Sequence, residues 1–112
     1  MSTDQFPLSP ELVAQASEIL GDVVEKTPVM YSQRLSDLVG VPVHLKREDM
    51  QTCRSFKVRG AYFRMSMLSE EERRRGVVCA SAGNHAQGLA YACSQLKVRG
   101  TIYLPSNTPK QK

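Results

Sequence analysis

The feature that most constrains the fold is residues 77–88, where an apolar run meets a turn of small residues and then a helical pattern. Val77–Ala80 predicts a short buried strand, and apolar or small residues recurring every three or four positions predict a helix over residues 84–97. A further short strand is predicted over residues 100–104. A strand–helix–strand unit of this kind implies that its two strands are parallel. The chain is therefore predicted to be an α/β protein.

The turn between this strand and this helix is Ser-Ala-Gly-Asn-His, at residues 81–85. Asn84 is a favourable helix N-cap, and Gly83 permits a tight turn or the close approach of a ligand. Backbone N–H groups left free here lie at the positive end of the helix, where a carboxylate or a phosphate binds favourably. Taken alone, the segment is also consistent with a plain strand–turn–helix corner.

A second motif lies upstream, Ser-Phe-Lys-Val-Arg-Gly-Ala at residues 55–61. Ser55 is predicted to cap a helix over residues 55–68, which places Lys57 in its first turn. A cation is unfavourable at the positive helix end, and two neighbouring arginines add like charge. Both effects favour the neutral amine, which is the form that reacts with an aldehyde. From the residues alone, an ordinary surface lysine is the alternative.

Together, the two motifs resemble those of pyridoxal-phosphate-dependent enzymes of the tryptophan synthase β type, and within that superfamily those of threonine dehydratases. The resemblance extends from about Glu18 to the last residue and includes Leu-Lys-Arg-Glu-Asp at residues 45–49. It implies the three-layer parallel-sheet fold of pyridoxal-phosphate fold type II. Because family members are several times longer, residues 1–112 are expected to be an incomplete N-terminal part of a catalytic domain. The remainder of that domain and any regulatory domain are expected to be absent.

The resemblance also implies roles for the residues of both motifs. Lys57 matches the lysine that holds pyridoxal 5′-phosphate as a Schiff base and removes the α-proton of the substrate. Phe56 would lie beside the cofactor, and Asn84 would hydrogen-bond to its ring hydroxyl. The seat for the substrate carboxylate would be lined, mostly through backbone N–H groups, by Ser81, Ala82, Gly83 and His85.

The reaction implied by the resemblance is deamination of L-threonine to 2-oxobutanoate and ammonia, the first step of isoleucine biosynthesis, by a cytoplasmic homo-oligomer. Serine racemases of this superfamily carry a second serine where this chain has Ala82, so the alanine favours elimination over racemisation. The preference for threonine over serine rests on overall resemblance only. A serine/threonine dehydratase of catabolic type is therefore an alternative, as is a non-catalytic truncated α/β module.

Two parts of the family's cofactor site have no match in this sequence: the glycine-rich phosphate-binding segment and the late Ser or Cys that faces the pyridine nitrogen. Without the phosphate-binding segment the cofactor lacks its main anchor, so we expect the 112-residue chain alone to have little or no dehydratase activity. Ser-Asn-Thr-Pro at residues 106–109 predicts the start of a further helix, with Thr108 as its cap.

Local signals predict the remaining elements. Ser9 is a good N-cap with proline after it, and Ser69 and Glu72 have the spacing of a capping box. His44 alternates with apolar residues and is predicted to be a surface residue of a strand, not a catalytic base. Helices are predicted over residues 10–25, 32–38 and 70–75, and a strand over residues 41–48.

Composition and charge exclude several classes of function. The net charge of +4 is modest. The basic run at residues 73–75 directly follows three glutamates, which indicates a solvated helix face and not a nucleic-acid site. The three cysteines and two histidines show no metal-ligand spacing, and a sparse odd set of cysteines suits reduced thiols in the cytoplasm. We find neither a signal peptide nor an apolar run as long as the ~20 residues of a membrane span.

Overall fold

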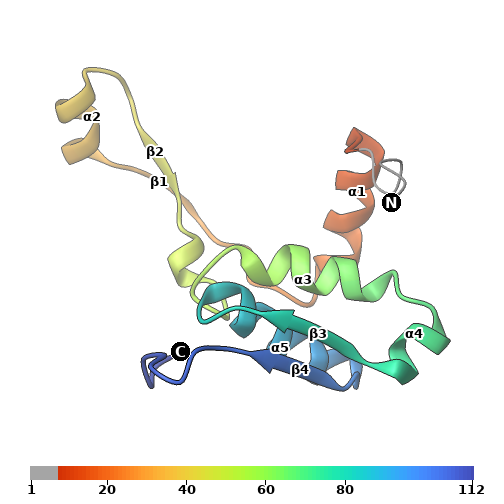
Figure 1. The fold of residues 1–112 in the computed structure, drawn as a ribbon. Helices are drawn as coiled ribbons and strands as arrows, with labels where there is room; N and C mark the ends of the chain where they lie inside the picture. Colours follow the sequence, from red (N-terminus) through yellow and green to blue (C-terminus); the bar gives the residue numbers. More distant parts are fainter. Residues whose placement is uncertain (1–7) are drawn as a thin grey trace.

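The computed structural model describes residues 8–112. The first residues, in which the sequence shows no signal peptide, lie outside this described part. Figure 1 shows a body of helices and strands with a long arm extending from it. In chain order the elements are α1 (Pro10–Leu20), β1 (Val29–Tyr31), α2 (Gln33–Val39), β2 (His44–Lys46), the 3₁₀ helix η1 (Glu48–Met50), α3 (Lys57–Ser66), α4 (Glu70–Arg75), β3 (Val77–Ala80), α5 (Asn84–Leu96) and β4 (Gly100–Tyr103).

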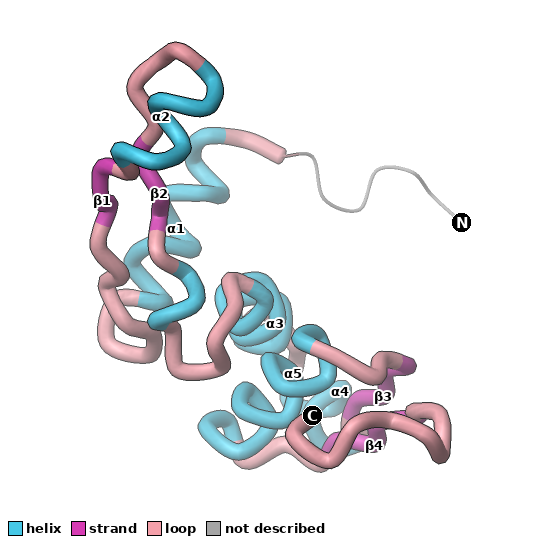
Figure 2. Tube along the Cα trace, turned by 90° about the vertical axis from the view of Figure 1, so that its left-hand side faces the viewer, coloured by secondary structure: helices cyan, strands magenta, loops and turns pink. Residues whose placement is uncertain are grey.

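The body consists of a parallel two-stranded sheet with helices packed against it. β3 and β4 pair in parallel, with Val77 opposite Gly100, and α5 connects them, as the sequence predicted. α3 packs against α5, and the buried core between these elements contains Met65, Leu89, Ala92 and Val98. Figure 2 shows α3 and α5 together beside the strands, so the described residues form two of the three layers expected of the fold. The predicted α/β class is confirmed.

The arm is an antiparallel pair of strands, β1 and β2, with α2 at its tip (Figure 1). Ser36 is buried in this tip, where its hydroxyl donates to the Ser32 carbonyl at 2.7 Å and accepts from the Val43 N–H at 2.9 Å. Gly40 ends α2 with a φ of 77°, a left-handed conformation that glycine adopts without steric strain. His44 is exposed and lies edge-on to Tyr31, with ring centroids 5.4 Å apart, so its predicted surface position is confirmed.

The predicted serine caps at Ser9 and Ser69 are confirmed, whereas the cap predicted at Ser55 is wrong, because Phe56 occupies the cap position of α3. Ser9 accepts from the Leu12 N–H at 3.1 Å and begins α1. Ser69 accepts from the Glu72 N–H at 3.2 Å, and Glu72 accepts from the Ser69 N–H at 2.8 Å, which completes the capping box of α4. Each of these bonds spans three residues, so the sequence alone contains both partners.

Several boundaries differ from the prediction. α1 ends at Leu20 instead of residue 25, because the residues that follow Leu20 form a turn. After this turn the Glu25 N–H donates to the side-chain oxygen of Gln51 at 2.8 Å. The strand predicted over residues 41–48 is limited to β2, since Pro42 has no N–H to contribute and Glu48 begins η1.

Two further predictions are wrong. β3 is only half buried, because helices cover one face of the sheet and Val78 on the other face is 71% exposed. Among the described residues after β4, the segment at 105–112 forms turns and no helix. There the Thr108 hydroxyl donates to the Pro105 carbonyl at 2.6 Å, and no helix begins at the residue predicted as a cap.

Candidate active site

Lys57 is the first residue of α3, and its amine is accessible. Ser55 is buried, and its hydroxyl accepts from the Lys57 N–H at 3.3 Å, so Ser55 supports the helix start although Phe56 occupies the cap position. The Lys57 side chain is exposed, with Nζ 5.7 Å from the centre of the Phe56 ring. Within residues 8–112 this amine has no hydrogen bond or ion pair, so it is free to react.

The loop before α5 is organised by Ser81, not by Asn84 as predicted. The Ser81 hydroxyl accepts from the Gly83 N–H at 3.2 Å and from the Ala86 N–H at 3.3 Å. Asn84 is the first helical residue, and the turn at Gly83 places the Ser81 oxygen over the end of the helix. The Asn84 side chain therefore does not cap the helix, and its Oδ1 accepts a hydrogen bond from Lys112 Nζ at 3.0 Å.

This loop retains backbone donors. In the described part of the chain, the N–H groups of Ala82, Asn84 and His85 have no hydrogen-bond partner. They lie at the N-terminus of a helix of 13 residues, where the helix dipole adds positive potential. The arrangement is chemically suited to accept a carboxylate.

A close crossing of α3 and α5 brings the two motifs together. A Cβ atom at Gly88 would lie 3.0 Å from the Val58 nitrogen and 3.1 Å from the Lys57 carbonyl oxygen, so the two backbones are in contact there. Beside this crossing, the Cys53 thiol donates to the Gln87 carbonyl at 3.7 Å, and burial raises the pKa of that thiol. The sequence analysis gave Gly88 no role, because only the packing shows that a side chain has no room there.

A cavity of about 540 Å³ lies next to Lys57. Phe56, Lys57, Arg64 and His85 line it, and most of the other lining residues are apolar residues of α3, β3 and α5. The structure thus brings three of the predicted site residues to one cavity. Ser81, Ala82, Gly83 and Asn84 do not line this cavity and form the neighbouring loop.

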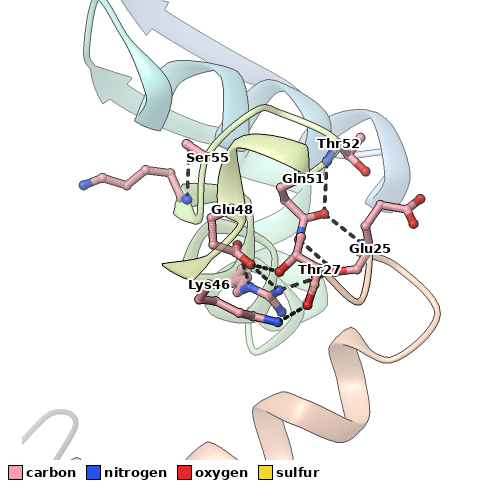
Figure 3. A network of polar contacts seen from close by, with 9 residues as sticks. Glu25, Thr27, Lys46, Glu48, Gln51, Thr52 and Ser55 are labelled. Atoms are coloured by element: carbon pink, nitrogen blue, oxygen red, sulfur yellow. Dashed lines mark hydrogen bonds and ion pairs between the residues drawn. The ribbon is translucent and has the colours of Figure 1, made fainter. Parts of the chain in front are cut away.

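A polar network on the other side of α3 ties three segments together (Figure 3). Arg59 of α3 binds the Glu48 carboxylate with both ends of its guanidinium, Nε to Oε2 at 2.9 Å and Nη2 to Oε1 at 2.8 Å. The buried Thr27 hydroxyl donates to the same carboxylate, and Lys46 Nζ donates to the Thr27 carbonyl. The guanidinium of Arg59 holds the pKa of Glu48 at about 2, well below its ordinary value of 4.5.

Gln51 completes this network and is 1% exposed. Its amide donates to the Glu25 carbonyl at 3.0 Å and accepts from the N–H groups of Glu25 at 2.8 Å and Thr52 at 3.0 Å (Figure 3). Sequence reasoning missed both Glu48 and Gln51 as functional candidates. The only available signal was their place in the segment that precedes the lysine motif.

Within residues 8–112, no group of three or more metal-ligating side chains is close enough to hold a metal ion. None of the described helices has the length and apolar character needed to cross a membrane.

Comparison with known proteins identifies relatives along almost the whole chain. It is 53% identical over 111 residues to the biosynthetic L-threonine dehydratase IlvA of Mycobacterium tuberculosis, covering 99% of this chain and 26% of that protein. It is 51% identical over 100 residues to the Bacillus subtilis enzyme of the same name, covering 89% of this chain and 24% of the relative. The chain therefore spans about a quarter of the length of the curated relatives it matches.

Solved structures similar to this chain also match it along most of its length. Maize serine racemase superposes with a TM-score of 0.86 at 31% identity, covering 94% of this chain and 32% of that structure. Threonine deaminase isoform 2 from Solanum lycopersicum superposes with a TM-score of 0.74 at 45% identity, covering 94% of this chain and 30% of its own. Residues 20–112, which contain both Lys57 and the loop of unpaired donors, match the family model described as pyridoxal-phosphate dependent enzyme, and the chain belongs to that family.

Proposed function

We propose that the chain is the N-terminal part of the catalytic domain of an L-threonine dehydratase, which converts L-threonine to 2-oxobutanoate and ammonia. The observation that carries this proposal is the crossing at Gly88, which brings the backbone of Lys57 against the helix that follows the loop with unpaired N–H donors. The Lys57 amine has no hydrogen bond or ion pair within residues 8–112. Identities of 51–53% to the M. tuberculosis and B. subtilis enzymes named biosynthetic L-threonine dehydratases support the choice of substrate and a place in isoleucine biosynthesis.

The residues present fit the aldehyde end of pyridoxal phosphate. Lys57 supplies a primary amine without a partner in the described chain, at the edge of a cavity of about 540 Å³. Phe56 at the same cavity would contact the cofactor ring, and the Asn84 side chain, which is not needed as a cap, would hydrogen-bond to its ring hydroxyl. No segment of this sequence matches a glycine-rich phosphate site, so the fit extends to this end of the cofactor only.

The proposed chemistry assigns two tasks to Lys57. Its amine would hold the cofactor and would take the α-proton of the bound substrate. When bound, pyridoxal phosphate spreads the negative charge that develops as this proton leaves. Departure of the β-hydroxyl and hydrolysis then give the 2-oxo acid and ammonia.

The loop before α5 would hold the substrate. Ser81, Ala82, Gly83 and His85 line the proposed seat for its carboxylate, and the N–H groups of Ala82 and His85, which have no partner in residues 8–112, would donate to it. The N–H groups of Ser81 and Gly83 are already bound, to the Tyr103 carbonyl at 3.0 Å and to the Ser81 hydroxyl at 3.2 Å. The dipole of α5 strengthens binding of an anion there. Binding the carboxylate would fix the α-carbon relative to Lys57 across the helix crossing.

Elimination is proposed over racemisation because Ala82 has no proton to donate from the face opposite Lys57. A dehydratase of catabolic type that acts on serine and threonine is the second candidate. We also propose that the whole enzyme is a homo-oligomer located in the cytoplasm. The three free cysteines of this chain support the cytoplasmic location.

A chimera tests the proposal. Residues 1–112 would replace the matching N-terminal quarter of the M. tuberculosis relative, and 2-oxobutanoate and pyruvate would be measured with threonine and serine as substrates. We expect the chimera to prefer threonine, and Lys57→Ala in the same chimera to lower turnover by about a thousandfold or more. The 112-residue chain alone should be inactive.

The outcomes separate the candidates. Preferential formation of pyruvate from serine would favour the catabolic dehydratase. A folded chimera that forms neither product, or one that retains full activity after Lys57→Ala, would exclude the proposed function.

A further inference from the structure

The first turn of α3 lacks the features that usually hold a helix start in place. Phe56 offers no side-chain cap, and the first turn has no acidic residue. Arg54, just before it, has a φ of 57°, which is unfavourable for a residue with a side chain. Lys57 and Arg59 also place positive charge at the positive end of the helix. The Ser55 hydroxyl, which accepts from the Lys57 N–H at 3.3 Å, is the one local support of this helix start named above, so the position of Lys57 depends strongly on contacts from other segments.

The Glu48–Arg59 pair supplies such a contact. Its bidentate geometry restrains both the position and the orientation of the Arg59 side chain, which enters from the first turn of α3. The pair is partly protected from water, with side-chain exposures of 32% for Arg59 and 15% for Glu48. Thr27 anchors the carboxylate to the loop before β1, so three segments distant in sequence meet at one ion pair.

The pair lies on the face of α3 opposite to Lys57. Residues two positions apart in an α-helix are separated by about 200° around the axis. Accordingly, Lys57 lines the cavity of about 540 Å³, whereas Arg59 lines a separate cavity of about 560 Å³ between α1 and α3. An anchor on the far face can hold the helix start without obstructing the lysine.

We propose that Glu48, Arg59 and Thr27 form a positioning clamp that fixes the first turn of α3 and keeps the Lys57 amine at its cavity. This inference rests on the proposed function, because the role assigned to the clamp is to position Lys57 for reaction. These three are positioning residues, because they act through the backbone of α3 and do not line the cavity beside Lys57.

The test measures the helix start and the lysine separately in the 112-residue chain. The variants are Glu48→Gln, which keeps the shape and removes the charge, and Arg59→Met, which keeps the apolar stem and adds no amine. Asp49→Asn is the matched control, because it removes the neighbouring exposed ion pair of Asp49 with Arg47. All variants would be compared under conditions where their circular dichroism equals that of the wild type.

Hydrogen exchange followed by mass spectrometry reports on the first turn of α3. We expect its amides to exchange about tenfold faster in Glu48→Gln and Arg59→Met, the loss typical of one charge-assisted hydrogen bond. Asp49→Asn should leave this exchange unchanged. Thr27→Val, which removes only the hydroxyl donor, should give a smaller acceleration and serves as the test if the stronger variants do not fold.

Trapping with pyridoxal phosphate and borohydride reports on the lysine. Modification at Lys57 is compared, in the same digest, with modification at the exposed Lys97 at the far end of α5. We expect an excess at Lys57 in the wild type and in Asp49→Asn, and near parity in the clamp variants. A merely structural ion pair would lower the stability of the chain without changing this ratio in the folded state.

Three results would overturn the proposal, and they are distinguishable. Unchanged exchange in the clamp variants would show that the pair does not hold the helix start. A wild-type excess at Lys57 that persists in the variants would show that the clamp does not position the lysine. Parity already in the wild type would show that Lys57 has no enhanced reactivity for a clamp to support in this chain, so the clamp would be refuted, whereas the proposed function is decided separately by Lys57→Ala in the chimera.

Discussion

Replacing Gly88 by alanine is the most direct test of the helix crossing on which the site depends. The added Cβ would lie 3.0–3.1 Å from three backbone atoms of Lys57 and Val58, and backbone atoms of a packed helix cannot move aside individually. Val58 is fully buried, so α3 as a whole must shift. Overpacking of this kind costs about 2 kcal/mol. The better helix propensity of alanine offsets about 1 kcal/mol of it, leaving a net loss of about 1 kcal/mol.

Gly60→Ala is the matched control. Gly60 is also inside a helix, α3, but a Cβ there would have no atom within 4 Å. This substitution should therefore raise the free energy of unfolding by about 1 kcal/mol through propensity alone. The two alanine variants should differ by about 2 kcal/mol, with opposite signs relative to the wild type.

Urea unfolding followed by far-ultraviolet circular dichroism measures both values on the same chain. We expect a lower midpoint for Gly88→Ala and a higher midpoint for Gly60→Ala, with unchanged slopes. The reasoning would be refuted if Gly88→Ala were as stable as Gly60→Ala. Such a result would mean that the two helix backbones are not in contact at Lys57.

Three other predictions concern the loop, the ion pair and the tether of α1. Ser81→Ala should lower the free energy of unfolding by about 1 kcal/mol, as expected for a lost helix cap. Asn84→Ala should change this free energy by less than about half of that amount, and urea unfolding of both variants measures the difference. Because the folded-state pKa of Glu48 lies at about 2 and below the ordinary 4.5, its contribution to stability is complete above pH 4.5 and is lost as the pH falls through about 2. The stability of the wild type should fall by up to about 3 kcal/mol across that interval, and the fall should be smaller in Glu48→Gln. Tyr91→Phe removes the hydroxyl that donates to the Val23 carbonyl at 3.1 Å, and should cost about 1 kcal/mol and accelerate hydrogen exchange in residues 21–25.

The helix starts at Ser9, Ser32 and Ser69 could be predicted because each cap is satisfied within three residues. β3 and α5 were predicted with the bounds that the structure shows, apart from one residue at the end of α5. Hydrophobic spacing is sufficient for these elements, since their buried side chains recur at the period of a helix or of a strand. The parallel pairing of β3 and β4 followed from the helix between them.

The predictions that failed depend on distant partners, on the local conformation of a turn or on the packing of a sheet face. The end of α1 is held by Gln51, whose amide binds Glu25 across 26 positions. Asn84 and Ser81 are both good capping residues, and only the conformation of the turn at Gly83 decides between them. Burial of β3 was overstated because its composition does not reveal that only one face of the sheet is covered.

The candidate site divides in the same way. The sequence by itself determined the lysine motif, the loop of small residues and the family, because these are properties of contiguous residues. Only the tertiary structure decided that Lys57 and His85 share a cavity, that Gly88 sets the distance between the two motifs, and that Glu48 is bound to Arg59. The physical reason is that a cap or a strand is defined by neighbours along the chain. A helix crossing and a partly buried ion pair depend on the packing of segments that the sequence leaves far apart.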